Sequence, residues 1–268
     1  MFGPINLSSF IKQNLLSLEN TSALIDRNQV RLATGNKVNN AIDDPSAFYN
    51  AESLRNRGAD FLNAKDAIGY AAGTVKAGID ALASISDVIE QMRGLAQQVA
   101  SQSASPGILG PQFAELRSQI DRIVNDASFH GVNIVNNSNL LKINFDEDAA
   151  SEQTITGTTN AASGLALNTS SVANFILASL AVTALTTALS SVRTRSIALG
   201  SNASFLEVLT DFTNRYVNGL KDGADRLTVA DVNEDSTTAT LLNTRKQIGV
   251  EALSLAAQSE QEIVKLFG

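Results

Sequence analysis

A seven-residue repeat of apolar side chains is the feature that most constrains how this chain can fold. Helices with two apolar positions in every seven residues bury that stripe against a partner helix, which is the pattern of a coiled coil. The clearest repeat has two apolar positions in every seven residues, and three residues after its later leading positions come smaller residues that include Ala64, Ala71 and Gly78. Its leading positions are Leu54, Phe61, Ile68, Val75, Leu82 and Ile89. The pattern predicts one long helix, which Asp44-Pro45 begins and residues 105–107 end.

Two more segments extend this pattern into a bundle. Phe113, Leu116 and Ile120 predict a helix that Gly110-Pro111 opens and that folds back antiparallel on the first, because the connection is short. A third long helix is expected from Val172 onward. Its repeat positions are Leu185, Val192, Leu199 and Leu206.

The two ends of the chain carry thinner apolar stripes among Asn, Ser, Thr, Gln and Ala residues. The stripe positions are Ile11, Leu18, Ile25 and Leu32 near the start, and Leu241, Ile248, Leu255, Ile263 and Leu266 near the end. Stripes this narrow do not stabilise a lone helix in water. We therefore expect the end helices to pair and to bury their stripes completely only among several copies. Gly35 is the expected stop of the first, and residues 229–236 the break before the last.

Between residues 131 and 171 the period changes. Residues 132–135 and 140–145 predict two strands around a turn at 136–139, with a possible further strand at 153–158. A ribbon and a solvent-facing loop follow from this reading, and a disordered linker is the alternative. The expected fold is mainly α: a long antiparallel helical bundle or coiled coil, a small β-hairpin region and paired terminal helices. The expected division is residues 1–40 with 236–268, residues 41–130 with 172–235, and residues 131–171.

Composition argues against several classes of function. The net charge is −7 without any run of Lys or Arg, which disfavours nucleic-acid binding. The chain has no cysteine and a single histidine, His130, and no glycine-rich phosphate loop, so we expect no catalytic site, metal or cofactor. No unbroken run of about 18 apolar residues predicts a membrane span. No cleaved signal peptide is expected at the N-terminus.

Six segments, in one order, resemble bacterial flagellins, particularly the alphaproteobacterial ones with a short centre. They are NLSSFIKQNLLSLENT, RLATGNKVNNAIDDPSAF, DAIGYAAGTVKAGIDALASISDVIEQMRGLAQQ, LRSQIDRIVNDASFHGVNIV, ALSSVRTRSIALGS and LLNTRKQIGVEALSLAAQSEQEIVKLF. The resemblance implies a structural subunit that polymerises into the extracellular flagellar filament, is exported unfolded and folds at the tip. It implies as partners copies of the chain, possibly other flagellins, the export apparatus with its chaperone, and the cap and junction proteins. It implies no membrane partner.

The resemblance leaves alternatives open. A hook–filament junction protein shares the terminal design and the turn of residues 34–45, and an enzyme would need a cluster of acid and base groups. The Ser/Thr-rich centre could accept O-linked sugars or form a plain solvated loop. An innate immune receptor recognises many flagellins through an Arg, a Glu and a Leu. This chain aligns Gln91, Gly94 and Leu95 there, so weak or absent activation is expected.

Overall fold

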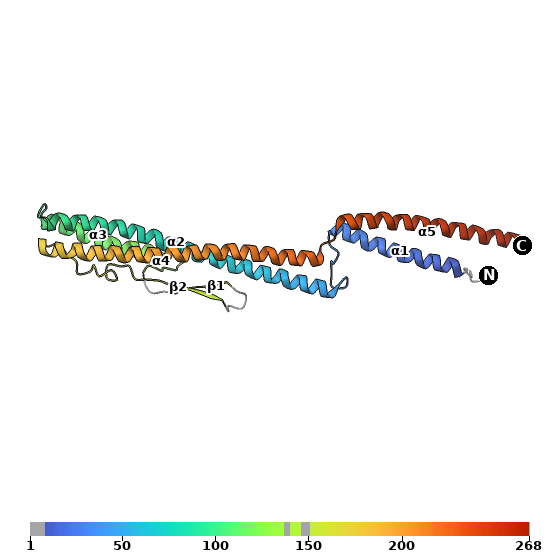
Figure 1. The fold of residues 1–268 in the computed structure, drawn as a ribbon, viewed down its shortest axis with the longest axis horizontal. Coiled ribbons are helices and arrows are strands. Elements are labelled where there is room, and N and C mark those ends of the chain that lie inside the picture. Colours follow the sequence, from blue (N-terminus) through green and yellow to red (C-terminus); the bar gives the residue numbers. More distant parts are fainter. Residues whose placement is uncertain (1–8, 137–139, 146–150, 268) are drawn as a thin grey trace. The chain divides into compact units, whose positions relative to one another are not determined.

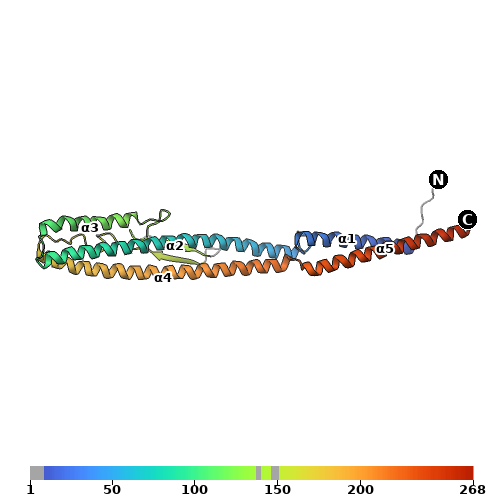
Figure 2. The ribbon, with the colours of Figure 1, turned by 90° about the horizontal axis from the view of Figure 1, so that it is seen from above.

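The computed structural model describes residues 9–136, 140–145 and 151–267. It confirms a mainly α fold with bundled helices, a small antiparallel hairpin and paired terminal helices (Figures 1 and 2). The chain forms two compact units, one of residues 57–219 and one of residues 1–56 with 220–268. The elements in order are α1 (Ser9–Thr34), α2 (Pro45–Ala100), α3 (Pro106–Asp126), β1 (Leu140–Asn144), β2 (Glu152–Thr156), α4 (Phe175–Thr228) and α5 (Val232–Phe267).

The end of α1 and the start of α2 lie where the sequence predicts them. Gly35 has φ +71°, and its N–H donates to the carbonyl of Arg31 at 2.8 Å, which closes the last turn of α1. Glycine adopts this left-handed conformation without the Cβ clash of other residues. At the start of α2, Asp44 Oδ1 accepts from the N–H of Ala47 at 2.9 Å. Both ends are therefore set by short-range chemistry.

Two helix starts were predicted too late in the chain. α3 begins at Pro106, so Gly110 and Pro111 lie inside it and do not open it. Pro106 occupies the first turn, where a missing N–H costs no hydrogen bond. α5 begins at Val232, because Asp231 Oδ1 accepts from the N–H groups of Asn233 and Glu234 at 2.9 and 3.2 Å. The break is therefore shorter than residues 229–236.

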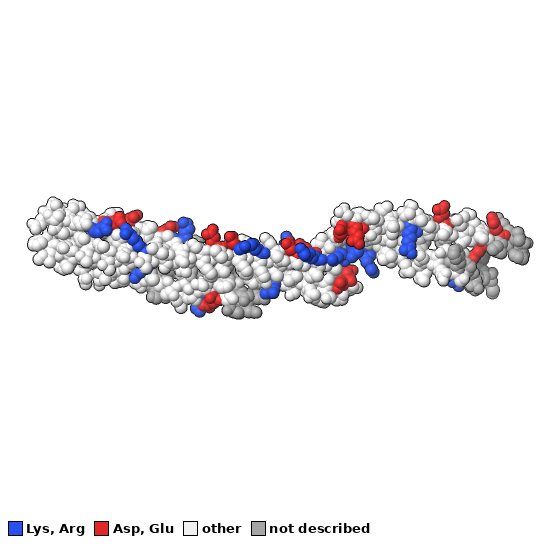
Figure 3. Space-filling model, in the orientation of Figure 1, with Lys and Arg blue, Asp and Glu red and all other residues white. Residues whose placement is uncertain are grey.

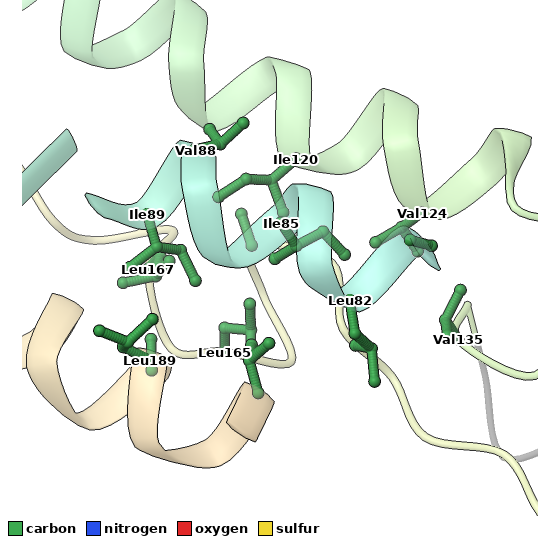
Figure 4. Packing of buried hydrophobic residues seen from close by; sticks show 14 of the residues in the cluster. Leu82, Ile85, Val88, Ile89, Ile120, Val124, Val135, Leu165, Leu167 and Leu189 are labelled. Atoms are coloured by element: carbon green, nitrogen blue, oxygen red, sulfur yellow. The ribbon is translucent and has the colours of Figure 1, made fainter. Parts of the chain in front are cut away.

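The core of residues 57–219 lies where α2, α3 and α4 pack side by side (Figure 4). Ile85 and Ile89 of α2, Ile120 of α3 and Leu189 of α4 are almost completely buried in this cluster. Gly78 lets α4 approach closely, since an added Cβ would lie 3.2 Å from Leu199 Cδ1. Burying a large aliphatic side chain contributes about 1.5–3 kcal/mol, so this seam supplies much of the stability of the unit.

The hairpin pairs different segments from those predicted. β1 pairs antiparallel with β2, with Leu141 opposite Ile155 and Ile143 opposite Gln153. Residues 132–135 form no strand, although Ile134 and Val135 are buried. Their carbonyls accept from the N–H groups of Thr158 and Asn160, outside any ladder. The apolar run is therefore a buried irregular segment. Part of the predicted turn, residues 137–139, lies outside the described residues.

Residues 157–172, here called the strap, leave β2 and run along the helices to the start of α4 (Figure 1). The strap buries Leu165, Leu167 and Val172 in the helical core. Side chains from two helices hold its backbone: Asp121 of α3 accepts from Ala162 N–H at 2.8 Å, and Arg195 of α4 donates to the Thr159 carbonyl at 2.8 Å. The strap is therefore an ordered part of the unit, and the alternative of a disordered linker is wrong for it.

Candidate assembly surfaces

The terminal helices α1 and α5 pack against each other in antiparallel directions, and α5 continues past the start of α1 (Figures 1 and 2). The predicted stripe of α1 faces this contact. Ile11 and Ile25 are 5% and 6% exposed, and Leu18 and Leu32 are partly buried. Leu18 lies over Gly249, where an added Cβ would be 3.3 Å from its Cδ1. The apolar stripe of α1 is thus largely used within one chain.

The predicted stripe of α5 points the other way. Leu241, Ile248 and Leu255 are 65%, 62% and 62% exposed, although they keep a seven-residue spacing. Leu242, one residue further, is 6% exposed and faces α1 instead. Each residue turns a helix by about 100°, so a shift of one position exchanges one face for another. The side chains of Ile263 and Leu266 lie outside the described ones.

A polar layer that the sequence analysis did not predict lies inside the α1–α5 contact. Thr21 and Asn28 are each 4% exposed, and Asn28 Nδ2 donates to Asp235 Oδ1 at 3.2 Å. Arg31 lies 3.5 Å from the same carboxylate oxygen. The signal was present in the sequence, because Asn14, Thr21 and Asn28 follow the apolar stripe at a spacing of three. Buried polar groups at such positions fix the register of two helices and lower their stability.

The turn between α1 and α2 is fastened to the break before α5. The N–H of Lys37 donates to the Thr228 carbonyl at 2.7 Å, and the N–H of Ala230 donates to the Gly35 carbonyl at 2.9 Å. Asp43 Oδ2 accepts from the N–H of Asn39 at 2.9 Å within the turn. The Asp43 carboxylate and these carbonyls accept hydrogen bonds from backbone N–H groups and so hold the turn in place.

The positions predicted for the bundle seam lie inside the chain. Most are fully buried or nearly so, while Leu54 and Leu116 are partly buried. Buried members are Phe61, Ile68, Val75, Leu82, Ile89, Phe113, Ile120, Leu185, Val192, Leu199 and Leu206. They hold one chain together and leave little surface for a second.

The positions aligned with the receptor patch line a surface groove between α2 and α3. Its volume is about 710 Å³, and Gly94 and Leu95 form one wall, with Leu116 and Pro111 opposite. Gln91 is exposed at the edge, and nothing lies within 4 Å of a Cβ added at Gly94. The groove offers apolar contact and amide groups, with Glu115 as its one charged lining residue.

Helix α4 is the one helix among the described residues that is long and apolar enough to cross a membrane by length and composition alone. An 18-residue window of it has a mean hydropathy of 1.9, yet only 33% of that window is buried. Within the same described residues, no group of three or more His, Asp or Glu side chains could hold a metal ion.

These features define a class of protein: a helical subunit with a largely complete core of its own, whose terminal helices leave an apolar face that finds no partner among the described residues. Models of the bacterial flagellin N-terminal and C-terminal helical regions match residues 5–140 and 181–267. The chain belongs to the bacterial flagellin family.

Its relatives agree over almost the full length. Flagellin FljO of Caulobacter vibrioides is 30% identical over 271 aligned residues, and flagellin FljM of the same species is 29% identical over 268. Each match covers 98% of both chains. The crystal structure of Bacillus cereus flagellin has 21% identity and a TM-score of 0.49, covering 56% of this chain and 88% of that one.

As a family member, the chain is a structural subunit of the bacterial flagellar filament, the polymer that drives swimming motility. It assembles with flagellin copies and lies outside the cell. Nothing in the family matches favours the hook–filament junction protein.

Proposed function

We propose that α1 and α5 form the inner core of the filament and that the outer face of α5 closes only between copies. The observation that carries this proposal is the exposure of Leu241, Ile248 and Leu255, a seven-residue stripe that finds no partner on its own α1. Fully burying each such side chain contributes about 2 kcal/mol. A helical polymer in which every copy offers this face gains that contribution at each addition.

In this proposal the other parts of the chain take the outer positions. Residues 41–130 with 172–235 form the helical layer around the core, and residues 131–171 lie on its solvent side, with Leu165 and Leu167 buried against the helices. The well-packed core of residues 57–219 supports an outer layer that folds without a neighbour, because most large side chains of its seam are already buried within one chain.

The weak stability of the terminal helices before assembly also bears on export. The α1–α5 contact contains polar layers at Thr21 and Asn28, and the α5 stripe is unburied, so the terminal pair is weakly stable before assembly. We expect the chain to pass unfolded through the flagellar export apparatus with a chaperone, without removal of a signal peptide, and to fold beneath the cap. Subunits from filaments should then have the intact mass of 28.3 kDa.

A charge placed in the α5 stripe tests the proposal. Ile248→Lys puts an ammonium group at the centre of the stripe, where burial without a partner costs several kcal/mol. Gln247→Lys places the same charge on the neighbouring exposed position and is the matched control. Negative-stain microscopy should show filaments for the control and none for Ile248→Lys, with equal helical content by circular dichroism.

The removal of residues 236–268 is a second test with the same expected loss. Filaments of normal length from Ile248→Lys, or from the shortened chain, contradict the proposal. Loss of filaments from both lysine variants also contradicts it, because the effect then does not belong to the stripe.

A further inference from the structure

The two terminal helices meet along rows of residues that repeat every seven positions. The inward rows of α1, all buried or partly buried, are Ile11, Leu18, Ile25 and Leu32, and, three residues later, Asn14, Thr21 and Asn28. The inward row of α5, also buried or partly buried, is Asp235, Leu242, Gly249 and Ala256. A repeated row offers a similar contact after every shift of seven residues. Apolar packing by itself therefore does not select one alignment of α1 with α5.

Asp235 is the member that breaks the repeat of α5. It is 7% exposed, and its Oδ1 accepts a hydrogen bond from Asn28 Nδ2 at 3.2 Å. Arg31 Nη1 lies 3.5 Å from the same oxygen. Within the described parts of both helices, the side-chain hydrogen bond and the ion pair that cross from α1 to α5 both end on this carboxylate.

The other polar groups of the pair do not choose an alignment. Thr21 donates to the carbonyl of Ser17 in its own helix at 2.8 Å, and this bond survives any shift of α5. Asn14 Nδ2 is buried without a hydrogen-bond partner among the described residues. In the view of Figure 3, the surface of α1 and α5 is mostly white beyond the mixed red and blue atoms near the start of α5. Exposed charges add little to the choice, because water and salt screen them.

A shift of α5 by one repeat, about 10 Å along the helix, shows what the Asp235 carboxylate discriminates. In one direction Asp235 moves beside Thr21, and its charge is then buried away from Arg31, which is strongly unfavourable. In the other direction Leu242 takes the place of Asp235, and the amide of Asn28 is left buried without its acceptor. The apolar members of the row carry no comparable penalty in either direction.

We propose that Asp235 is a positioning residue that, with Asn28 and Arg31, selects one of the alignments that the apolar rows allow. We call these three residues the register lock. This inference rests on the proposed function and deepens it. A slip by one repeat moves the exposed stripe of α5 by about 10 Å relative to α1, and a helical polymer requires every copy to present the same faces at the same places.

A register lock differs from an ion pair that only stabilises. Asn28 Oδ1 is buried without a hydrogen-bond partner among the described residues, so the lock has a cost in stability. Apolar side chains often replace a buried ion pair without loss of stability. Asp235→Leu should therefore keep α1 and α5 paired while they lose their single alignment. A pair of charges that acts only through stability predicts the opposite: fewer paired helices in an unchanged alignment.

Two spin labels can report the alignment, because the chain contains no cysteine. Gln29→Cys and Gln258→Cys place them on exposed positions of α1 and α5. Gln29 is next to Asn28, and Gln258 lies twenty-three residues beyond Asp235, so the labels should be about 34 Å apart. Double electron–electron resonance measures this distance in filaments diluted with an excess of unlabelled subunits, and in separated subunits.

With the lock unchanged, one distance is expected. Asp235→Leu should add a second population, shifted by about 10 Å. Glu234→Leu is the matched control, because Glu234 is exposed in the same first turn of α5 and the change removes the same charge. This control should keep the single distance.

A single, unchanged distance for Asp235→Leu overturns the inference, as do two populations in both leucine variants. A featureless spread of distances for Asp235→Leu with loss of helical content also overturns it, because the carboxylate then acts through stability. A broad distribution for the unchanged lock in both states overturns it as well, since no single alignment then exists.

The two proposals fail separately. If the unchanged chain forms no filaments, the proposed function fails, while the distances in separated subunits still test the lock. If filaments form and Asp235→Leu keeps one distance in them, the proposed function stands and the lock is refuted.

Discussion

Replacing Asn160 by alanine should loosen the strap from the helices. Asn160 has no exposed surface. Its Nδ2 donates to the carbonyls of Val135 at 3.0 Å and Thr158 at 2.8 Å, and its Oδ1 accepts from Arg195 at 2.7 Å. The guanidinium is partly buried, and this burial lowers the pKa of Arg195. One side chain therefore joins the strap, the segment before β1 and helix α4.

The magnitude follows from the bonds that the variant loses. Two hydrogen bonds between neutral groups contribute about 1 kcal/mol each, and one to a charged group about 2 kcal/mol. Asn160→Ala should thus cost about 4 kcal/mol of unfolding free energy. At about 2–4 °C per kcal/mol for a unit of this size, the melting temperature should fall by about 8–16 °C.

The assay is thermal unfolding of separated subunits, followed by circular dichroism, with amide hydrogen exchange as a local readout. Exchange at Leu165 and Leu167, whose N–H groups bond within the strap at 3.0 and 2.7 Å, should accelerate first. Asn168→Ala is the control, because Asn168 is exposed in the same strap and should change stability by about 0.5 kcal/mol or less. Equal and small shifts for both variants would refute the reasoning.

Three more predictions test other parts of the chain. Gly35→Ala should lower the free energy of unfolding by about 1–2 kcal/mol, because a Cβ at φ +71° strains the end of α1. Gly69→Ala, which adds a Cβ in open space within α2, should not destabilise the chain, so equal melting temperatures for the two variants would contradict the strain argument. Hydrogen bonds from Lys142 and Thr154 lower the pKa of Glu152 from 4.5, so this ion pair stabilises the hairpin above pH 4.5 and loses its effect as the pH falls through the lowered pKa. A carboxyl titration by NMR with a midpoint at or above 4.5 would contradict this shift. The innate receptor should respond weakly in reporter cells, because Gln91 and Gly94 depart from the usual pattern although Leu95 matches it. Potency equal to that of a motif-complete flagellin would contradict this prediction.

The long helices were predictable because their signals are local and repeated. The heptads beginning at Leu54 placed α2, and Asp44 and Gly35 placed helix ends by hydrogen bonds to nearby backbone. Such signals need no knowledge of distant residues. Pro111 was wrongly predicted to start α3, because a proline in the first turn of a helix and one in the second turn look alike in sequence.

The strand pairing could not be read in the same way. Residues 132–135 have the composition of a strand, but their carbonyls bond to Thr158 and Asn160, more than twenty residues further along the chain. β1 pairs with β2 instead of with residues 132–135. Short apolar runs satisfy many pairings equally well, so the choice depends on which segment the folded bundle brings near.

The sequence by itself determined the class of fold, the order of the helices and the presence of apolar stripes at both ends, because these depend on spacing within one helix. It did not determine which side of each helix is left open. Leu241 and Leu242 are neighbours of the same type, yet one is 65% and the other 6% exposed. A helix face is buried or free according to the partners that surround it, and that is a property of the tertiary structure alone.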